Sequence, residues 1–411
     1  MSPLTARFAA LALAAALAGC GGSGSDAGKA TPAAAAASDA ATPAPRARPF
    51  ALDTHVDIPL DFATANVDPR DGNLQVNLTK MRSGGLDAAF FIVYVGQGPR
   101  TEQGYAKARA DALTKFAAIH RMTDELYPDL IELAYTPADM ERIAAAGKLA
   151  AAIGIENGFV LGKDLEMLDR YYELGARYVT LVHDGDNDLA RSARPDPKLG
   201  DAPDSTAGVT ELGAVAIERM NRLGIMVDVS HGGKQTALDA MKLSRAPVIA
   251  SHSGVAGVNK HPRNMDDETL LALRDDGGVI QVVAYDAYLR PQPDDEIAAL
   301  RELRERVLAG RSFEQLDPQT RAEYDAGVAE IHKKWPQASV RDLVNHIDYA
   351  VRLIGIDHVG ISSDFGGGGG VVGWNNASET SNVTAELRAR GYSDDDIAKL
   401  WGGNFLRVWR E

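Results

Sequence analysis

Cysteine is nearly absent from this chain. Among 411 residues only Cys20 is a cysteine, so an intramolecular disulfide is excluded. Lysine and arginine form no stripe along the sequence, and the net charge is −14. Because an acidic surface repels phosphate backbones, we expect no nucleic-acid partner. The apolar fraction of 45% is ordinary for a globular protein, and together these features favour an acidic globular enzyme.

The first 20 residues have the features of an export signal. A short segment with Arg7 precedes the apolar residues 8–17, and small residues lead to Cys20. The apolar stretch is too short to cross ~30 Å of hydrocarbon. The sequence Leu17-Ala18-Gly19-Cys20 resembles the bacterial lipoprotein signal, which implies a signal peptide over residues 1–19 and an acylated Cys20 as the mature N-terminus. A plain secretory signal followed by an unrelated cysteine is the alternative.

A tether is predicted after the signal. Residues 20–48 consist almost entirely of small and polar residues and lack apolar bulk, so we expect a flexible segment between Cys20 and a folded body over 49–411. We therefore expect an exported protein that is lipid-anchored to a bacterial membrane. Gly21 after the acylated cysteine is compatible with the outer membrane, with the body on its periplasmic side.

Short apolar or β-branched runs alternate with amphipathic segments throughout the body. Such repeated units predict an α/β fold with a parallel sheet, and eight strands predict closure into a (β/α)8 TIM-type barrel. The charged and proline-containing residues 285–340 predict a mostly helical insertion between strands 7 and 8, which walls an active site or an interface, or has no function. The strands are expected near 50–55, 86–94, 149–155, 178–183, 225–230, 247–252, 278–283 and 358–363, and helices over 105–122, 212–223, 234–243 and 266–274.

Five metal-ligand candidates lie at predicted strand ends. His55 and Asp57 are two residues apart and so face the same side of a strand. Glu156 follows a buried apolar run, where a bare charge is costly, so it either forms an ion pair with Lys or Arg or bridges two cations. His231 and His252 end consecutive strands. Imidazole and carboxylate groups are ligands that zinc-type ions prefer, which predicts two zinc ions, with manganese or cobalt as alternatives.

Three further residues are candidates for catalysis or substrate binding. His183 ends another predicted strand and either ligates a metal or polarises a substrate. Asp364 precedes a glycine run and could carry a proton between nucleophile and leaving group. Arg263 lies in a loop after the sixth strand, where a guanidinium suits a substrate carboxylate; a surface salt bridge is its alternative role. His120, His261, His332, His346 and His358 receive no role.

Several motifs together resemble the membrane or renal dipeptidases, peptidase family M19 of the amidohydrolase-like barrels. The motifs are DTHVDIP (53–59), GIENG (154–158), YVTLVHDGDN (178–187), MVDVSH (226–231), PVIASHSGVAGVNKHPRN (247–264), HIDYAVRLIGIDHVGISSDF (346–365) and WGGNFLRVW (401–409). They span the body from about 50 to 410. The chain departs from the family pattern at Gly366, in the acidic residues 184–188 and in the long insertion.

The resemblance implies a role for each candidate. It places the first metal on His55 and Asp57, the bridging carboxylate on Glu156, the second metal on His231 and His252, substrate polarisation on His183, the substrate carboxylate on Arg263 and proton transfer on Asp364. The implied reaction is hydrolysis of a dipeptide with a free C-terminal carboxylate, through a metal-bridging hydroxide, with tolerance of a C-terminal D-residue. A homodimer is one option for the assembly.

Two other functions stay open on the sequence. Another binuclear amidohydrolase, such as an N-acyl amino acid deacylase, a lactonase or a phosphotriesterase, would share the fold, although such enzymes commonly carry a bridging carboxylated lysine for which no strand end offers a candidate. The second open function is that of a lipid-anchored binding protein, which would have kept the fold and lost catalysis.

Overall fold

The computed structural model describes residues 48–203, 206–309, 311 and 316–411. The expected signal peptide and nearly all of the expected tether lie outside the described residues, as does Cys20. Within the described ranges, no helix combines the length and apolar character that a membrane span requires.

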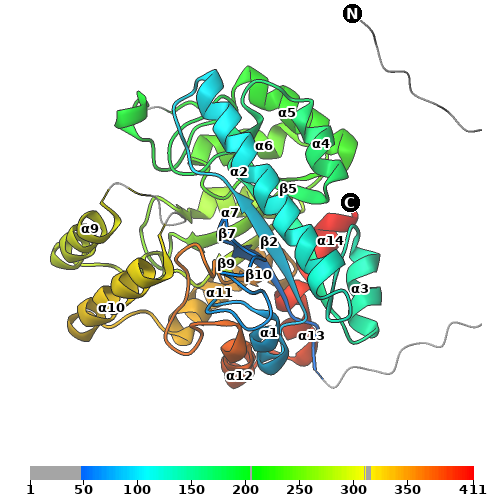
Figure 1. The fold of residues 1–411 in the computed structure, drawn as a ribbon, viewed down its shortest axis with the longest axis vertical. Coiled ribbons are helices and arrows are strands. Elements are labelled where there is room, and N and C mark those ends of the chain that lie inside the picture. Colours follow the sequence, from blue (N-terminus) through cyan, green and yellow to red (C-terminus); the bar gives the residue numbers. More distant parts are fainter. Residues whose placement is uncertain (1–47, 204–205, 310, 312–315) are drawn as a thin grey trace, which may run out of the picture. The chain divides into compact units, whose positions relative to one another are not determined.

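Eight parallel strands form a nearly closed barrel (Figure 1), which confirms the predicted fold class. Backbone contacts from Phe365 and Asp364 to the first strand complete the ring: Asp57 N–H donates to Phe365 O at 2.8 Å, and Asp364 N–H donates to His55 O at 3.2 Å. In order around the barrel, the strands are β1 (Leu52–Asp57), β2 (Ala88–Tyr94), β4 (Leu149–Glu156), β5 (Ala176–Thr180), β6 (Met226–Asp228), β7 (Ile249–Val255), β9 (Val279–Val283) and β10 (Val359–Ser362).

All eight predicted strands are present, with ends that differ by a few residues. Two short strands outside the ring were not predicted: β3 (Ile131–Leu133) pairs with β4, and β8 (Asn264–Met265) pairs with the end of β7. Runs of two or three residues carry too little periodicity to be read from sequence. The main strands were readable because they are almost wholly buried, and both faces therefore demand apolar residues.

Helices surround the barrel and include the predicted ones (Figure 1). Their starts carry caps: Thr101, Thr210 and Asp266 each accept a backbone N–H from the first turn of the following helix. The helices are α1 (Leu78–Gly84), α2 (Glu102–His120), α3 (Pro137–Ala145), α4 (Met167–Glu173), α5 (Glu211–Leu223), α6 (Lys234–Leu243), α7 (Asp267–Asp275), α11 (Val340–Ile354), α12 (Thr380–Ala389), α13 (Asp394–Ala398) and α14 (Asn404–Arg410). Short helical turns occur at Arg121–Leu126, Gly158–Leu161, Pro197–Leu199, Ile356–His358, Ala377–Glu379 and Lys399–Gly403.

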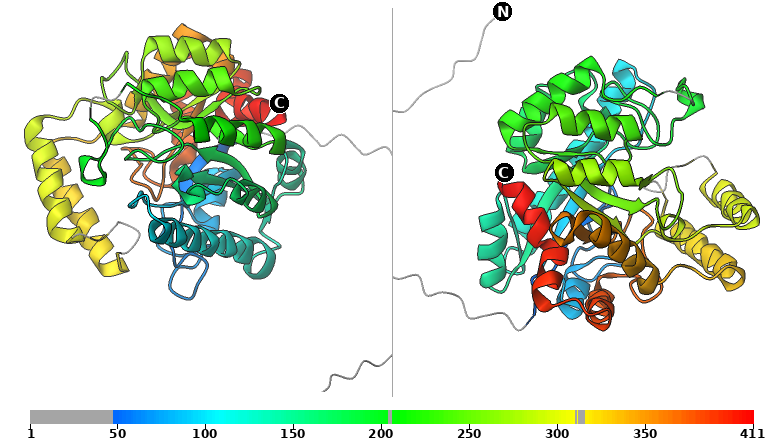
Figure 2. Two further views of the ribbon diagram at one scale, coloured as in Figure 1. Left: turned by 90° about the horizontal axis from the view of Figure 1, so that it is seen from above. Right: turned by 180° about the vertical axis from the view of Figure 1, so that it is seen from behind.

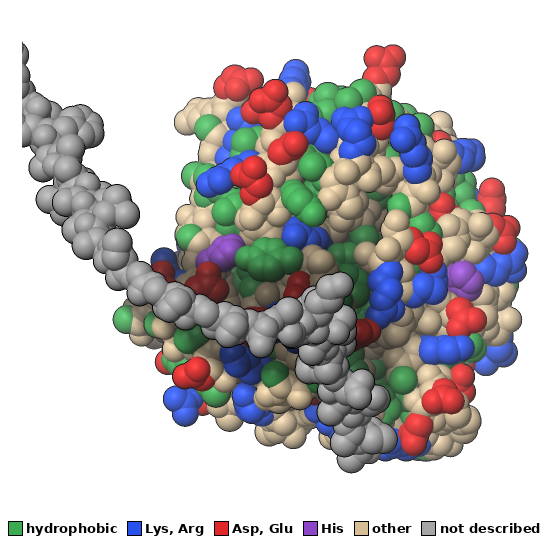
Figure 3. All heavy atoms as spheres, turned by 90° about the vertical axis from the view of Figure 1, so that its right-hand side faces the viewer, with side chains coloured by type: hydrophobic (Ala, Val, Ile, Leu, Met, Phe, Trp, Pro, Cys, Tyr) green, Lys and Arg blue, Asp and Glu red, His purple; other side chains and the backbone are tan. Residues whose placement is uncertain are grey.

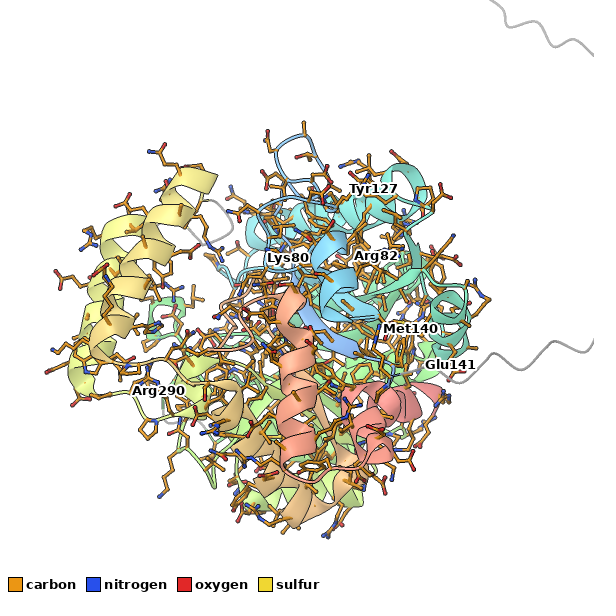
Figure 4. The ribbon with its side chains drawn as sticks, turned by 90° about the horizontal axis from the view of Figure 1, so that it is seen from below. Lys80, Arg82, Tyr127, Met140, Glu141 and Arg290 are labelled. Carbon is orange, nitrogen blue, oxygen red and sulfur yellow. The ribbon has the colours of Figure 1, made fainter. Side chains whose placement is uncertain are left out.

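The expected helical insertion lies between β9 and β10. It contains α8 (Asp286–Leu289), α9 (Asp294–Leu308) and α10 (Pro318–Lys334), and Figure 2 shows the last two as a pair at the side of the barrel. These two helices share a small core of their own that includes Leu303 and Val307. Arg290, labelled beside this pair in Figure 4, donates to the carboxylates of Asp286 and Glu296 and so fixes the start of the insertion.

Charged side chains of the two signs are interspersed on the face shown in Figure 3. Mixed charge of this kind is typical of an ordinary solvated surface and does not favour one class of charged partner.

A half-buried carboxyl beneath the barrel makes folding depend on pH. Asp276 accepts the backbone N–H of Val248 at 2.8 Å, and its burial raises its pKa to about 6. The folded protein therefore holds this proton more tightly than the unfolded chain. The contribution of protonated Asp276 to the free energy of unfolding is complete below about pH 4 and is lost as the pH rises through about 6.

We predict that Asp276→Asn stabilises the protein at about pH 8 by about 1–3 kcal/mol, because the amide keeps the acceptor and removes the partly buried charge. At about pH 4 the two proteins should have equal stability. Denaturant unfolding at both pH values measures this. The neighbouring Asp275→Asn is the control, since that side chain is 67% exposed. A stabilisation that is equal at both pH values would contradict the assignment.

Candidate metal centre

The predicted site residues gather at the carboxyl-terminal ends of the barrel strands. Glu156 is the last residue of β4, and His55 and Asp57 lie at the end of β1. Three expected strand-end positions differ in detail: His183 and His231 come three residues after their strands, and Asp364 comes two residues after β10.

His252 does not end its strand, as the sequence suggested, but lies in the middle of β7. The strand continues because Gly254 and Val255 pair with β8. The early ends of β6 and β10 also have a local cause. The backbone after them turns into the left-handed region, with φ of 65° at His231 and 57° at Asp364. Such conformations cost about 1–3 kcal/mol each and gather at functional sites.

The Glu156 carboxylate lies between two groups of side chains. Its Oε2 is 3.4 Å from His55 Nε2, while its Oε1 is 3.0 Å from His231 Nε2 and 3.3 Å from His252 Nε2. On the Oε2 side, His55 Nε2 is also 3.5 Å from Asp57 Oδ2. Each oxygen of one carboxylate therefore belongs to a separate cluster of potential ligands. In each cluster the potential ligand atoms lie within 4.8 Å of one another, close enough to share one metal ion.

The hydrogen bonds behind two of the histidines define their tautomers. Tyr178 O–H donates to Thr54 O, so it can only accept from His55 Nδ1–H, at 2.9 Å. Ser251 O–H donates to Asp228 Oδ2 and likewise accepts from His252 Nδ1–H, at 2.9 Å. Both rings therefore present a bare Nε2 lone pair toward Glu156, which is the form that ligates a metal.

Orphaned polar atoms test whether cations fit this centre. His55 Nε2 and Asp57 Oδ2 are buried and have no hydrogen-bond partner. Glu156 is only 4% exposed, and no lysine or arginine of the described residues forms an ion pair with it. Burying these groups without compensation is costly, and two divalent cations would satisfy all of them. The donor set suits zinc, and it also suits manganese or cobalt.

The pKa shifts of two buried side chains also indicate that the centre favours cations. Burial alone would lower the pKa of His55, but the charges of Glu156 and Asp57 outweigh it and raise this pKa well above 6.5. Burial, with the negative charge of Asp57, raises the pKa of Asp364 well above its usual value. The centre thus attracts positive charge.

Two glycines make room for these groups. A Cβ at Gly367 would lie 2.4 Å from Asp364 Oδ1 and 2.5 Å from Asp57 Oδ2, so the glycine run after Asp364 lets the backbone approach both carboxylates. A Cβ at Gly154 would lie 2.2 Å from the ring of Tyr178, which holds His55.

The remaining predicted residues line the rim of the centre. His183 Nε2 is 3.7 Å from Glu156 Oε1, and Asp364 Oδ1 is 3.9 Å from His55 Nε2. Burial, with the charge of His231, lowers the pKa of His183 to about 4. Arg263 is 3% exposed and stacks over Tyr288, with 5.3 Å from Cζ to the ring centroid. Its Nε has no partner, and no carboxylate of the described chain pairs with it, so it is not a surface salt bridge.

Sequence reasoning missed an aromatic wall beside Arg263. Tyr285 and Tyr288 stack with centroids 4.3 Å apart, and His261 lies 4.7 Å from Tyr288. The tyrosines follow the end of β9, and their place after a barrel strand was the signal that could have found them. Of the five histidines without a role, His261 is the one at this rim.

The sequence matches the Membrane dipeptidase family (Peptidase family M19) over residues 46–411. The chain belongs to peptidase family M19. Dipeptidase aclJ of Aspergillus oryzae is 30% identical over 340 residues, which are 81% of this chain and 69% of that protein. Dipeptidase tcpJ of Claviceps purpurea is 30% identical over 342 residues, 82% of this chain and 69% of that protein.

Two solved structures share the fold of this chain. The probable dipeptidase PvdM from Pseudomonas aeruginosa is 39% identical, with a TM-score of 0.78 over 88% of this chain and 95% of that one. A metallo peptidase from Rhodobacter sphaeroides, liganded with a phosphinate mimic of the dipeptide L-Ala-D-Ala, has the same fold at 21% identity, with a TM-score of 0.67 over 88% of this chain and 99% of that one. The protein is a metallo-dipeptidase of family M19 with a buried His/Glu metal-binding cluster.

The hydrogen bond behind His55 yields a prediction. Tyr178→Phe should weaken metal binding by about 10–100-fold, because His55 loses the acceptor that holds its tautomer and orientation. Competition with a graded chelator, read as ions per chain, measures the loss. Tyr171→Phe is the matched control, since the Tyr171 hydroxyl is buried without a partner. Equal metal affinity in the two variants would show that the Tyr178 hydroxyl does not support the site.

Proposed function

We propose that this protein is a binuclear zinc dipeptidase, which hydrolyses the peptide bond of dipeptides with a free C-terminal carboxylate. The observation that carries the proposal is the Glu156 carboxylate, whose two oxygens face two separate ligand clusters. His55, Asp57 and Glu156 would hold one ion, and Glu156, His231 and His252 the other. Bound there, the ions would supply Lewis acidity and lower the pKa of a water molecule toward neutrality.

Arg263 binds the substrate carboxylate in this proposal. Its guanidinium is buried, has an unpartnered Nε and donates Nη2–H to His252 O at 3.1 Å, which holds it beside the centre. A charged, planar donor of this kind suits a carboxylate, which it can bind through two parallel hydrogen bonds. Because the group is buried close to the centre, only a short peptide could place both its terminal carboxylate and its scissile bond correctly.

Proton transfer and charge stabilisation fall to two side chains. Asp364 takes the proton of the attacking water and delivers it to the leaving amine nitrogen. His183 donates a hydrogen bond to the carbonyl oxygen as negative charge develops there. Both lie within 4 Å of a candidate ligand, as this division of work requires.

A hydrolysis screen tests the proposal. Purified protein is assayed on L,L-dipeptides, on Gly-D-Ala and L-Ala-D-Ala, on the same compounds with an amidated C-terminus, on an N-acetyl amino acid and on a lactone. We expect turnover of free dipeptides only, loss with chelator and recovery with zinc. Faster turnover of the acyl amino acid or lactone would favour another amidohydrolase. Bound metal without any turnover would favour a binding protein.

Asp364→Asn should retain both ions and lose turnover of dipeptides by about 10²–10⁴-fold, the usual contribution of general acid–base catalysis. Metal analysis beside steady-state kinetics separates the two effects. Activity close to that of the wild type would remove Asp364 from the mechanism.

We also propose that the protein is exported and attached to a membrane, in the outer membrane on the periplasmic side, through a lipid on Cys20 and a tether over 20–48. The support is the signal-like sequence before Cys20 and the start of the family match at residue 46. Fractionation of cells that express the full chain and its Cys20→Ala variant would test the anchor: release of the variant alone is expected. We also propose that the protein forms a homodimer. A molar mass from light scattering that equals one chain would contradict this.

A further inference from the structure

We propose that Asp184 is a positioning residue for the second metal ion, acting through His231. The proposal rests on the assignment of His231 as a ligand of that ion. Asp184 lies outside the set of ligands and helpers described above, and its role is to hold one histidine by a direct charged hydrogen bond.

The distances place His231 between Glu156 and Asp184. Its Nε2 is 3.0 Å from Glu156 Oε1, and its Nδ1 is 3.3 Å from Asp184 Oδ1. Both carboxylates accept and neither can donate. With an ion held on the Glu156 side, as the proposed function requires, the proton of His231 lies on Nδ1 and is donated to Asp184. The Asp184–His231 pair therefore sets the tautomer that metal binding requires.

The two other histidine ligands are supported differently. His55 and His252 each donate Nδ1–H to a hydroxyl, of Tyr178 and Ser251 respectively. Of the Nδ1 contacts described for these three rings, only that of His231 is to a carboxylate. A direct carboxylate partner makes an imidazole more basic than a hydroxyl partner does. Of His231 and His252, His231 therefore becomes the stronger ligand for the second ion.

The loop that carries Asp184 is tied to the turn that carries His231. Gly185 N–H donates to Arg194 O at 2.8 Å, and Ala193 N–H donates to His231 O at 2.7 Å. Ser192 O–H donates to His183 O at 2.5 Å. These bonds join the segment 183–194 to the turn at His231 and hold the side chains of Asp184 and His231 within reach of each other.

Arg194 provides the counter-charge. Its Nη1 lies 3.1 Å from Asp184 Oδ2, and the side chains of Asp184 and Arg194 are 35% and 49% exposed. Asp184 thus uses one oxygen for His231 and the other for Arg194. The alternative role for Asp184 is only to neutralise Arg194 at the rim, and the experiment has to separate the two roles.

The test measures zinc affinity by chelator competition, with ions per chain counted by mass spectrometry, in the full folded enzyme. Asp184→Asn should lower the affinity for one of the two ions by about 10–100-fold and leave the affinity for the other unchanged. Asp184→Glu, which keeps the charge, should restore most of the affinity. Arg194→Gln should bind both ions like the wild type, and the Asp184→Asn/Arg194→Gln double variant should behave like Asp184→Asn.

Asp188→Asn is the matched control, because Asp188 lies on the same loop but bonds to Tyr105, 2.7 Å away. It should bind both ions normally. The proposal is overturned if Asp184→Asn binds both ions like the wild type, or if the double variant recovers full affinity. It is also overturned if the affinity for both ions falls together, which would indicate general damage to the fold. A wild type that binds no zinc would instead reject the proposed function.

Discussion

The carboxylate of Glu156 is the constraint on which the rest of the site depends. It is buried at the end of β4, and three imidazole nitrogens approach it within 3.0–3.4 Å, without a lysine or arginine to balance the charge in the described chain. Such an arrangement is unfavourable in a bare interior and favourable around divalent cations. The barrel accepts it because other strands bring the imidazole groups and a second carboxylate to the same rim.

A second layer of contacts gives this cluster its orientation. Tyr178 and Ser251 accept the Nδ1–H of His55 and His252, and Asp184 lies 3.3 Å from Nδ1 of His231, so that all three rings aim Nε2 inward. Space for this layer comes from small residues, since any side chain at Gly154 would collide with Tyr178. Sites held in this way lose little by reorganisation when a ligand or a substrate arrives.

Stability and chemistry are separated along the barrel axis. The apolar cores lie within and around the strands, whereas Asn157, His231 and Asp364, three of the five non-glycine residues with positive φ in the described chain, lie at the rim that holds the centre. This strain is tolerated because the packed barrel beneath it determines the positions of these residues. The insertion α9–α10 adds a separate small core at the side, which leaves the architecture of the centre intact.

The sequence by itself determined the strands, the insertion and the identity of the side chains that meet at the centre, because burial on both faces and strand-end polar residues leave a local imprint. It could not determine which Glu156 oxygen faces which cluster, that His252 lies within its strand, or that Arg263 is buried without a carboxylate partner. It also could not bring Asp184 and Tyr178 behind two of the histidines. The last two contacts join residues that are 47 and 123 positions apart in the sequence, respectively. Local periodicity carries no information about contacts over such separations.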